Sequence, residues 1–129
     1  MGDRANVVIK GYGDSRVYLY THWGGYNLPA VVHRALSRKQ RWDDAPYLAR
    51  IIFCEMVKND IDGETGYGIS SHIEDNEYDL IVIDTEAGTI GLAHESEQPD
   101  TYTSGSIASF VDKDIADKKG WQALGHQDE

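Results

Sequence analysis

Alternating apolar and polar residues open the chain and predict two β-strands. In "ANVVIKGYG", Val7 and Ile9 fall on one side of an extended chain, and Asn6, Val8 and Lys10 fall on the other. After the turn sequence "GYGDS", the stretch "RVYLYTHW" predicts a second strand that pairs with the first as a hairpin.

The two faces of the second strand differ in chemistry. Leu19 belongs to an apolar face, which we expect to pack against helices, whereas Tyr18, Tyr20 and His22 lie on an aromatic face. This aromatic face needs a cover, for which the C-terminal arm, a second copy of the protein or a ligand are the alternatives.

A first helix is indicated by five apolar residues at helical spacing: Leu28, Val31, Val32, Ala35 and Leu36. Asn27 is expected to be its N-cap, and Pro29 fits its first turn.

A second helix follows in "RWDDAPYLARIIFCEMVKND", capped by Asp43 or Asp44. It is apolar nearly all round, with Arg50 and Glu55 as exceptions, which predicts a central helix of the core. Cys54 lies among its apolar residues and is expected to be an unreactive core thiol.

The rest of the chain predicts further strands and a polar end. Strands are expected near 67–71, in "YDLIVIDT", in "TIGLAHE" and, as an edge strand, in "SIASFVD". Gly88 is expected to have a positive φ in the hairpin turn. Residues 113–129 read as a polar C-terminal arm that is dispensable for folding and anchored only by Trp121.

These elements predict an α+β fold. We expect an antiparallel sheet in the order ββααβββ, with two consecutive helices packed on one face. Residues 1–112 would form a single domain, followed by the arm.

Composition favours a soluble cytoplasmic protein. Of the 129 residues, 40% are apolar and 26% are charged, as in ordinary globular domains. No apolar run reaches the ~18 residues that span a bilayer, and the N-terminal residues lack the layout of a secretory signal. A single cysteine fits a reducing compartment.

Charge is distributed unevenly along the chain. Residues 1–54 carry 8 Lys and Arg against 4 Asp and Glu, whereas residues 55–129 carry 4 against 18. The net charge of −10 makes a nucleic-acid polymer an unlikely partner, although the first half could hold a local anion site. No phosphate-binding loop, zinc-binding cysteine pair or metal spacing among the five histidines is present, so no cofactor, metal or catalytic residue is expected.

A candidate ligand site lies at the strand-to-helix corner "YTHWGGYN". Glycines allow close approach to the backbone, and a helix start attracts anions. The candidate residues combine these glycines with aromatic and polar side chains: Arg16, Tyr18, Tyr20, His22, Trp23, Gly24, Gly25 and Asn27. The alternative is purely structural, with the glycines making a turn and the aromatic residues filling a packing face or a dimer interface.

The stretches "MGDRANVVIK", "VYLYTHWGGYNLP", "RWDDAPYLARIIFCEMV" and "GETGYGIS" resemble a family of small uncharacterised proteins of bacteriophage and bacterial genomes. The resemblance covers roughly residues 1–94 and implies a bacterial cytoplasm, without an established activity that could be assigned to residues.

Three functions are therefore open. The first is a non-enzymatic binding module, such as a phage accessory protein, that sequesters a small anionic or nucleotide-like molecule. The second is an acidic protein-interaction module that blocks a host protein. The third is a small enzyme with His22 as general base. We also expect a homo-oligomer, most simply a dimer, because the sheet leaves edges and an aromatic face to be covered.

Overall fold

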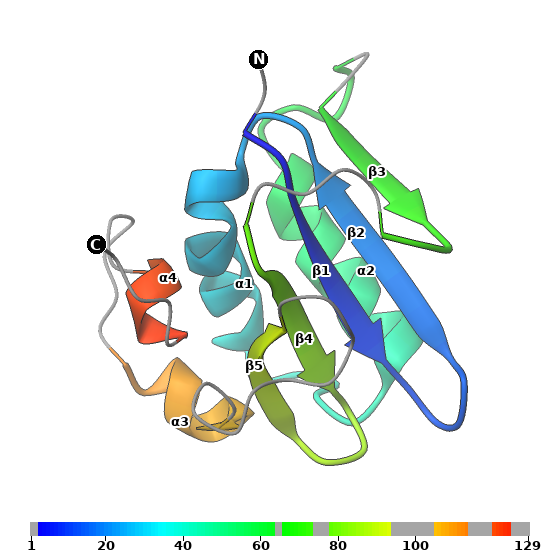
Figure 1. The fold of residues 1–129 in the computed structure, drawn as a ribbon, viewed down its shortest axis with the longest axis vertical. Coiled ribbons are helices and arrows are strands. Elements are labelled where there is room, and N and C mark those ends of the chain that lie inside the picture. Colours follow the sequence, from blue (N-terminus) through cyan, green and yellow to red (C-terminus); the bar gives the residue numbers. More distant parts are fainter. Residues whose placement is uncertain (1–2, 64–65, 74–77, 94–104, 114–119, 125–129) are drawn as a thin grey trace.

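One mixed sheet carries the helices on one of its faces (Figure 1). The structure is a computed structural model that describes residues 3–63, 66–73, 78–93, 105–113 and 120–124. Its strands are β1 (Ala5–Lys10), β2 (Arg16–Thr21), β3 (Tyr67–Ser70), β4 (Leu80–Asp84), β5 (Thr89–Ala93) and β6 (Gly105–Ser106). Its helices are the 3-10 turn η1 (Gly25–Asn27), α1 (Leu28–Leu36), α2 (Ala45–Val57), α3 (Ile107–Val111) and α4 (Gly120–Ala123).

The strand order β3-β2-β1-β4-β5-β6 confirms the α+β class and corrects one detail. Every neighbouring pair is antiparallel except β1 and β4, which run parallel, so the expectation of a wholly antiparallel sheet was wrong at this pair. The two central strands are buried on both faces, which is why both read as nearly continuous apolar runs.

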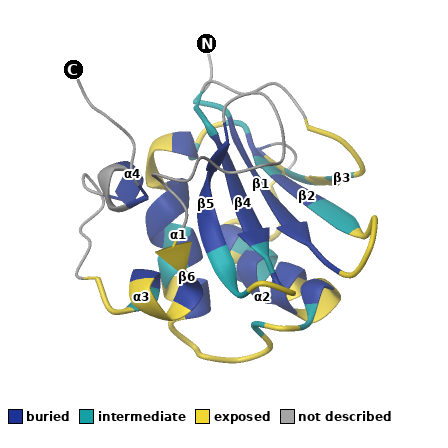
Figure 2. Ribbon diagram, turned by 60° about the horizontal axis from the view of Figure 1, so that its bottom comes forward, coloured by how far each residue is buried: buried dark blue, intermediate teal, exposed yellow. Residues whose placement is uncertain are grey.

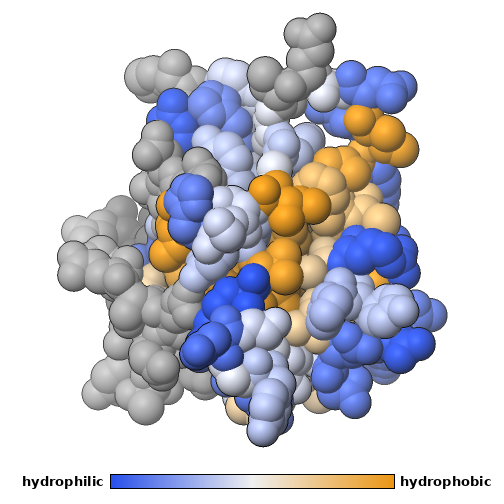
Figure 3. Space-filling model, turned by 90° about the vertical axis from the view of Figure 1, so that its right-hand side faces the viewer, coloured by the Kyte–Doolittle hydropathy of each residue, from blue (hydrophilic) through white to orange (hydrophobic). Residues whose placement is uncertain are grey.

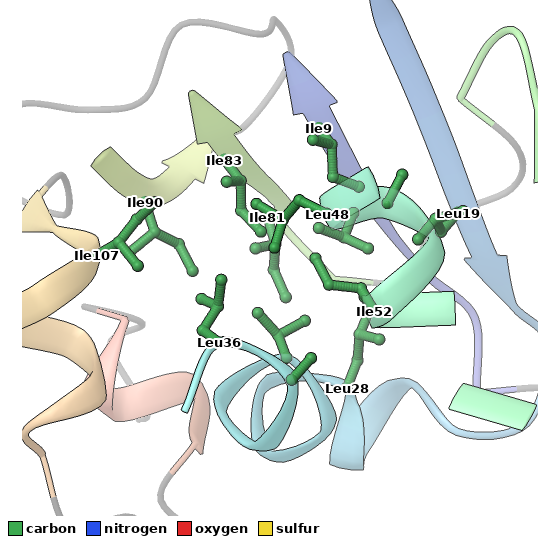
Figure 4. Packing of buried hydrophobic residues seen from close by; sticks show 14 of the residues in the cluster. Ile9, Leu19, Leu28, Leu36, Leu48, Ile52, Ile81, Ile83, Ile90 and Ile107 are labelled. Carbon is green, nitrogen blue, oxygen red and sulfur yellow. The ribbon is translucent and has the colours of Figure 1, made fainter. Parts of the chain in front are cut away.

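The main core lies between the sheet and the helices (Figure 4). The expected inward face is confirmed, because Val7, Ile9 and Leu19 are at most 1% exposed. Leu28 and Leu36 of α1 point into the same layer. On α2, which we expected to be apolar and buried nearly all round, Ile52 is fully buried, whereas Phe53 is only partly so.

The opposite face of the sheet has a second cluster, and Figure 2 shows β1 and β4 buried along most of their length. The cluster consists of Val8, Tyr18, Leu80, Val82 and Ala93. The described part of the C-terminal arm does not cover it, because Trp121 and Leu124 belong to the core on the helix side. That a second copy of the protein or a ligand covers this face of the sheet remains a prediction.

The segment "SIASFVD" is mainly helical, so its expected edge strand was wrong beyond its first residue. Of the described residues after β5, Gly105 and Ser106 pair with this strand, and α3 begins at Ile107. The Ser106 side chain caps this helix by accepting from the Ser109 N–H at 3.0 Å. Ile107 and Phe110 are buried at a spacing of three residues, which a helix satisfies and a strand does not.

The C-terminal arm contributes to the core through α4, which lies beside α1 (Figure 1). Trp121 is 5% exposed and stacks on Tyr78 with ring centroids 4.6 Å apart. Its indole N–H donates to the Gly25 carbonyl at 3.0 Å. Trp121, the expected anchor of the arm, is thus a core residue, which argues against the arm being dispensable. Residues 114–119 and 125–129 of the arm lie outside the described residues.

Candidate functional site

The corner between β2 and α1 is held by residues distant in sequence. The Asp3 N–H donates to the His22 carbonyl at 2.7 Å, and the His22 N–H donates to the Gly66 carbonyl at 2.8 Å. These bonds extend the sheet past the ends of β1, β2 and β3. His22 is therefore hydrogen-bonded to Asp3 on one side and to Gly66 on the other, just before the chain turns into the helix.

The backbone donors at the start of the helix are already satisfied within the protein. The Gly24 N–H donates to Thr21 Oγ1 at 3.0 Å, and the Gly25 N–H donates to the Asp3 carbonyl at 2.8 Å. The Tyr26 N–H donates to Asp3 Oδ2 at 2.8 Å. The Asp3 carboxylate thus occupies the place that we expected an anionic ligand to take.

Asn27 does not act as the expected N-cap. Its side chain makes no cap hydrogen bond, because the chain already turns through η1 before α1 begins. Pro29 does lie in the first turn of α1, as expected. At α2, Asp44 is the N-cap position, also without a side-chain cap bond.

Gly25 is required by packing rather than by a ligand. A Cβ there would lie 2.6 Å from the Asp3 carbonyl oxygen and 2.8 Å from Tyr78 Cε2. Tyr78 is itself fixed, since its hydroxyl donates to Asp3 Oδ1 at 2.6 Å. The backbone approaches its own protein here, which explains one of the two adjacent glycines.

The aromatic side of the corner forms a small polar cluster. The Arg4 Nε–H donates to His22 Nδ1 at 3.3 Å, and Tyr20 Oη lies 3.0 Å from the same nitrogen. The Trp23 ring meets the His22 ring edge to face at 4.0 Å and is 57% exposed. Nδ1 of His22 is therefore engaged within the protein, which argues against this nitrogen acting as a general base.

The structure does not bring all eight predicted residues together. Tyr18 is buried in the second cluster at 7% exposure. Arg16 lies at the opposite end of β2, about 20 Å from His22 along the strand, and donates to the carbonyls of Gly13 and Ser15. Both are therefore remote from the corner.

A pocket of about 210 Å³ lies on the helix side of the same corner. Its apolar floor comes from α1 and α2, and its polar rim comes from both helices, the corner and β3. The apolar residues are Leu28, Val31 and Met56, and the polar or small ones are Thr21, Gly24, Asn27, Arg34, Glu55, Lys58, Asn59, Asp60 and Tyr67. Gly24 and Asn27 are thus the predicted residues that line this pocket, and Tyr20 lines a different one, beside β3.

Glu55 is the buried charge of this pocket, with a side chain 6% exposed. Lys58 Nζ lies 3.1 Å from its Oε1 and Arg34 Nε lies 3.5 Å from the same atom, while Arg38 donates to Oε2. Burial on its own raises the pKa of Glu55, but the hydrogen bonds and charges of Arg38 and Lys58 outweigh burial, so the pKa is lowered from its ordinary value.

The positive charge around Glu55 exceeds what one carboxylate neutralises. Three cations, those of Arg34, Arg38 and Lys58, surround the Glu55 carboxylate. The carboxylate of Asp60 on the pocket rim neutralises a second positive charge, so one positive charge remains in excess. The Arg34 and Lys58 side chains are each 48% exposed, so they can reach a ligand.

A larger hollow of about 450 Å³ lies between the β1–β2 turn and the start of α2. Its charged side chains, Asp43, Asp44 and Glu86, are all at least partly exposed, and Tyr12 on its wall is 85% exposed. It has no buried charged group to orient a ligand, so the pocket at Glu55 is the better candidate.

Sequence reasoning missed Arg34, Glu55, Lys58 and Asp3. A signal was present in the first helix, where Arg34 and Arg38 lie four residues apart off the apolar stripe. The acid in the otherwise apolar second helix was a second signal, because such a residue is buried only when cations surround it.

No family model, no curated protein and no solved structure matches this chain. Among the described residues, no helix has both the length and the apolar character needed to cross a membrane. The same part of the chain contains no group of three or more His, Cys, Asp or Glu side chains placed to hold a metal ion. Cys54 is half-buried rather than deep in the core, with Arg50 Nη1 3.8 Å from its sulfur.

Proposed function

We propose that the protein is a non-enzymatic module that binds a small anionic molecule in the pocket between α1, α2 and the corner. The observation that carries this proposal is the excess of cations around the buried Glu55, at a pocket with an apolar floor. In a chain of net charge −10, such a local excess of positive charge distinguishes this pocket from the predominantly acidic remainder of the sequence.

The pocket favours a ligand with a charged end and a flat or apolar end, as in a nucleotide. Arg34 and Lys58 would hold the anionic group, since both approach the pocket from one side of Glu55. The apolar floor at Leu28, Val31 and Met56 would take the uncharged part. In the bacterial or phage setting that the sequence resemblance implies, such a module would sequester the molecule rather than transform it.

Native mass spectrometry of the full chain, purified from bacterial cells, tests whether a molecule is retained. The expected result is one small anionic adduct that Val31→Trp removes, because the larger side chain fills the pocket. An adduct that persists in Val31→Trp would place the ligand elsewhere and contradict the proposal.

Isothermal titration with AMP and with inorganic phosphate then tests the charge. Arg34→Gln is expected to weaken binding of AMP about tenfold, equivalent to ~1.4 kcal/mol. Arg50→Gln is the matched control, because it removes an exposed arginine of α2 that does not line the pocket. Equal affinities in the two variants, or no adduct and no binding of either probe, would show the proposal to be wrong.

A further inference from the structure

The outer edge of β3 is open in the described part of the chain. β3 is the terminal strand of the sheet, and its inner side pairs with β2. The His22 N–H donates to the Gly66 carbonyl, so hydrogen-bonded pairs recur at every second residue from there, at Gly68 and Ser70. The backbone groups of Tyr67 and Ile69 therefore point away from β2, toward the open edge.

This edge is bordered by exposed apolar side chains. Ile69 is 64% exposed and Ile61 is 75% exposed. Beside β3, a groove of about 230 Å³ is lined by Phe53 and Val57 of α2, together with Asp60, Ile61, Gly63 and Tyr67. Figure 3 views this side of the molecule and shows a band of hydrophobic surface between hydrophilic regions.

The charge around β3 selects between possible occupants. Residues 59–79 contain seven Asp and Glu and no Lys or Arg. Asp60 and Asp62, among the described ones, are exposed. Pairing of β3 with β3 of a second copy would bring two such acidic segments together, which like-charge repulsion disfavours. A partner that carries basic residues would meet an opposite charge instead.

We propose that the outer edge of β3 takes up an extended segment of another protein, in which apolar and basic side chains alternate, as an added strand. The backbone groups of Tyr67 and Ile69 would pair with the segment. Its apolar side chains would lie on the groove beside Phe53 and Val57, and its basic side chains would face the acidic surroundings. Tyr67 borders both this groove and the pocket at Glu55, but none of the cations around Glu55 lines the groove, and the inference does not depend on the proposed small-molecule site.

Fluorescence anisotropy with a labelled peptide of alternating valine and lysine, (Val-Lys)4, tests the inference on the full chain. Ile69→Pro is expected to weaken binding about tenfold, because proline removes the outward N–H of residue 69 without removing a bond to β2. Ile69→Thr is the matched control, since it keeps the N–H and a β-branched side chain. It should retain most of the affinity, and circular dichroism should show an unchanged fold in both variants.

Two further peptides separate strand addition from simple charge attraction. A (Val-Lys)4 peptide that is N-methylated at every residue cannot donate hydrogen bonds along either edge, and (Val-Glu)4 has the opposite charge; both should bind at least about tenfold more weakly. Equal binding of the N-methylated peptide, or unchanged affinity in Ile69→Pro, would overturn the inference. So would a wild-type dimer, seen by light scattering, that Ile69→Pro dissociates, because the occupant would then be a second copy.

Discussion

Gly24 and Gly25 are neighbours in the sequence and have opposite surroundings in the structure. Gly25 is buried, and a Cβ there would lie 2.6 Å from the Asp3 carbonyl oxygen. Gly24 is half-buried, lines the pocket at Glu55, and a Cβ there would meet only Thr21 Oγ1, at 3.1 Å. The Gly25 side of the corner is filled by other parts of the protein, and we call it the closed side. The Gly24 side faces the pocket, and we call it the open side.

The closed side is built from three distant parts of the chain. Asp3, Tyr78 and Trp121 converge on Gly25, and the Tyr78 and Trp121 rings stack there. The open side is built by the two consecutive helices, whose polar side chains meet at Glu55. A glycine pair in a sequence is therefore not evidence of a ligand until the neighbours of each glycine are known.

The largest expected effect is on the closed side. Trp121→Ala should lower the free energy of unfolding by ~3–5 kcal/mol, because it empties a buried aromatic position and removes the hydrogen bond to the Gly25 carbonyl. Urea denaturation measures this loss, with Trp23→Ala as the control at an exposed tryptophan. A loss below ~1 kcal/mol for Trp121→Ala would mean that the arm is dispensable after all.

A direct contrast comes from the two glycines. Gly25→Ala should cost ~1–3 kcal/mol, because the backbone of Asp3 and the ring of Tyr78 must move. Gly24→Ala should cost less, about 0.5 kcal/mol, since its φ of −107° suits alanine and only the Thr21 hydroxyl must shift to make room. Thermal or urea unfolding compares them, and equal costs would refute the assignment of closed and open sides.

The open side should be sensitive to acid. The pKa of Glu55 is lowered in the folded protein from 4.5, so its contribution to stability is complete above that pH and is lost as the pH falls through the lower, folded value. Urea unfolding at several pH values should show a smaller decline below pH 4.5 for Glu55→Gln than for the wild type. A parallel decline in the two proteins would mean that the cations do not stabilise the carboxylate.

The smallest effect is expected at the aromatic cluster. His22→Ala should change the affinity of the pocket for AMP by less than about twofold, because His22 does not line it. Titration alongside Arg34→Gln measures both. If His22→Ala weakens binding about tenfold while Arg34→Gln does not, the ligand lies on the aromatic side of the corner, as the sequence alone suggested.

Local patterns were enough to predict several elements. Alternation assigned Leu19 to the helix side and Tyr18 to the opposite face, and the structure confirms both. Helical spacing located α1, and Gly88 has the expected positive φ, at 70°. In "SIASFVD" the apolar spacing fits more than one element, and the choice of helix rests on the Ser106 cap and on the burial of Ile107.

The sequence by itself determined which residues alternate, which form a helical stripe and where the chain must turn, because these properties depend on neighbours within a few positions. Only the tertiary structure decided that β1 pairs in parallel with β4 and that Asp3 fills the helix start. It also decided that Trp121 closes the corner, across 96 positions of sequence. Contacts between residues so far apart arise from the burial of whole elements, and no local pattern encodes which distant side chain will reach a given donor or cavity.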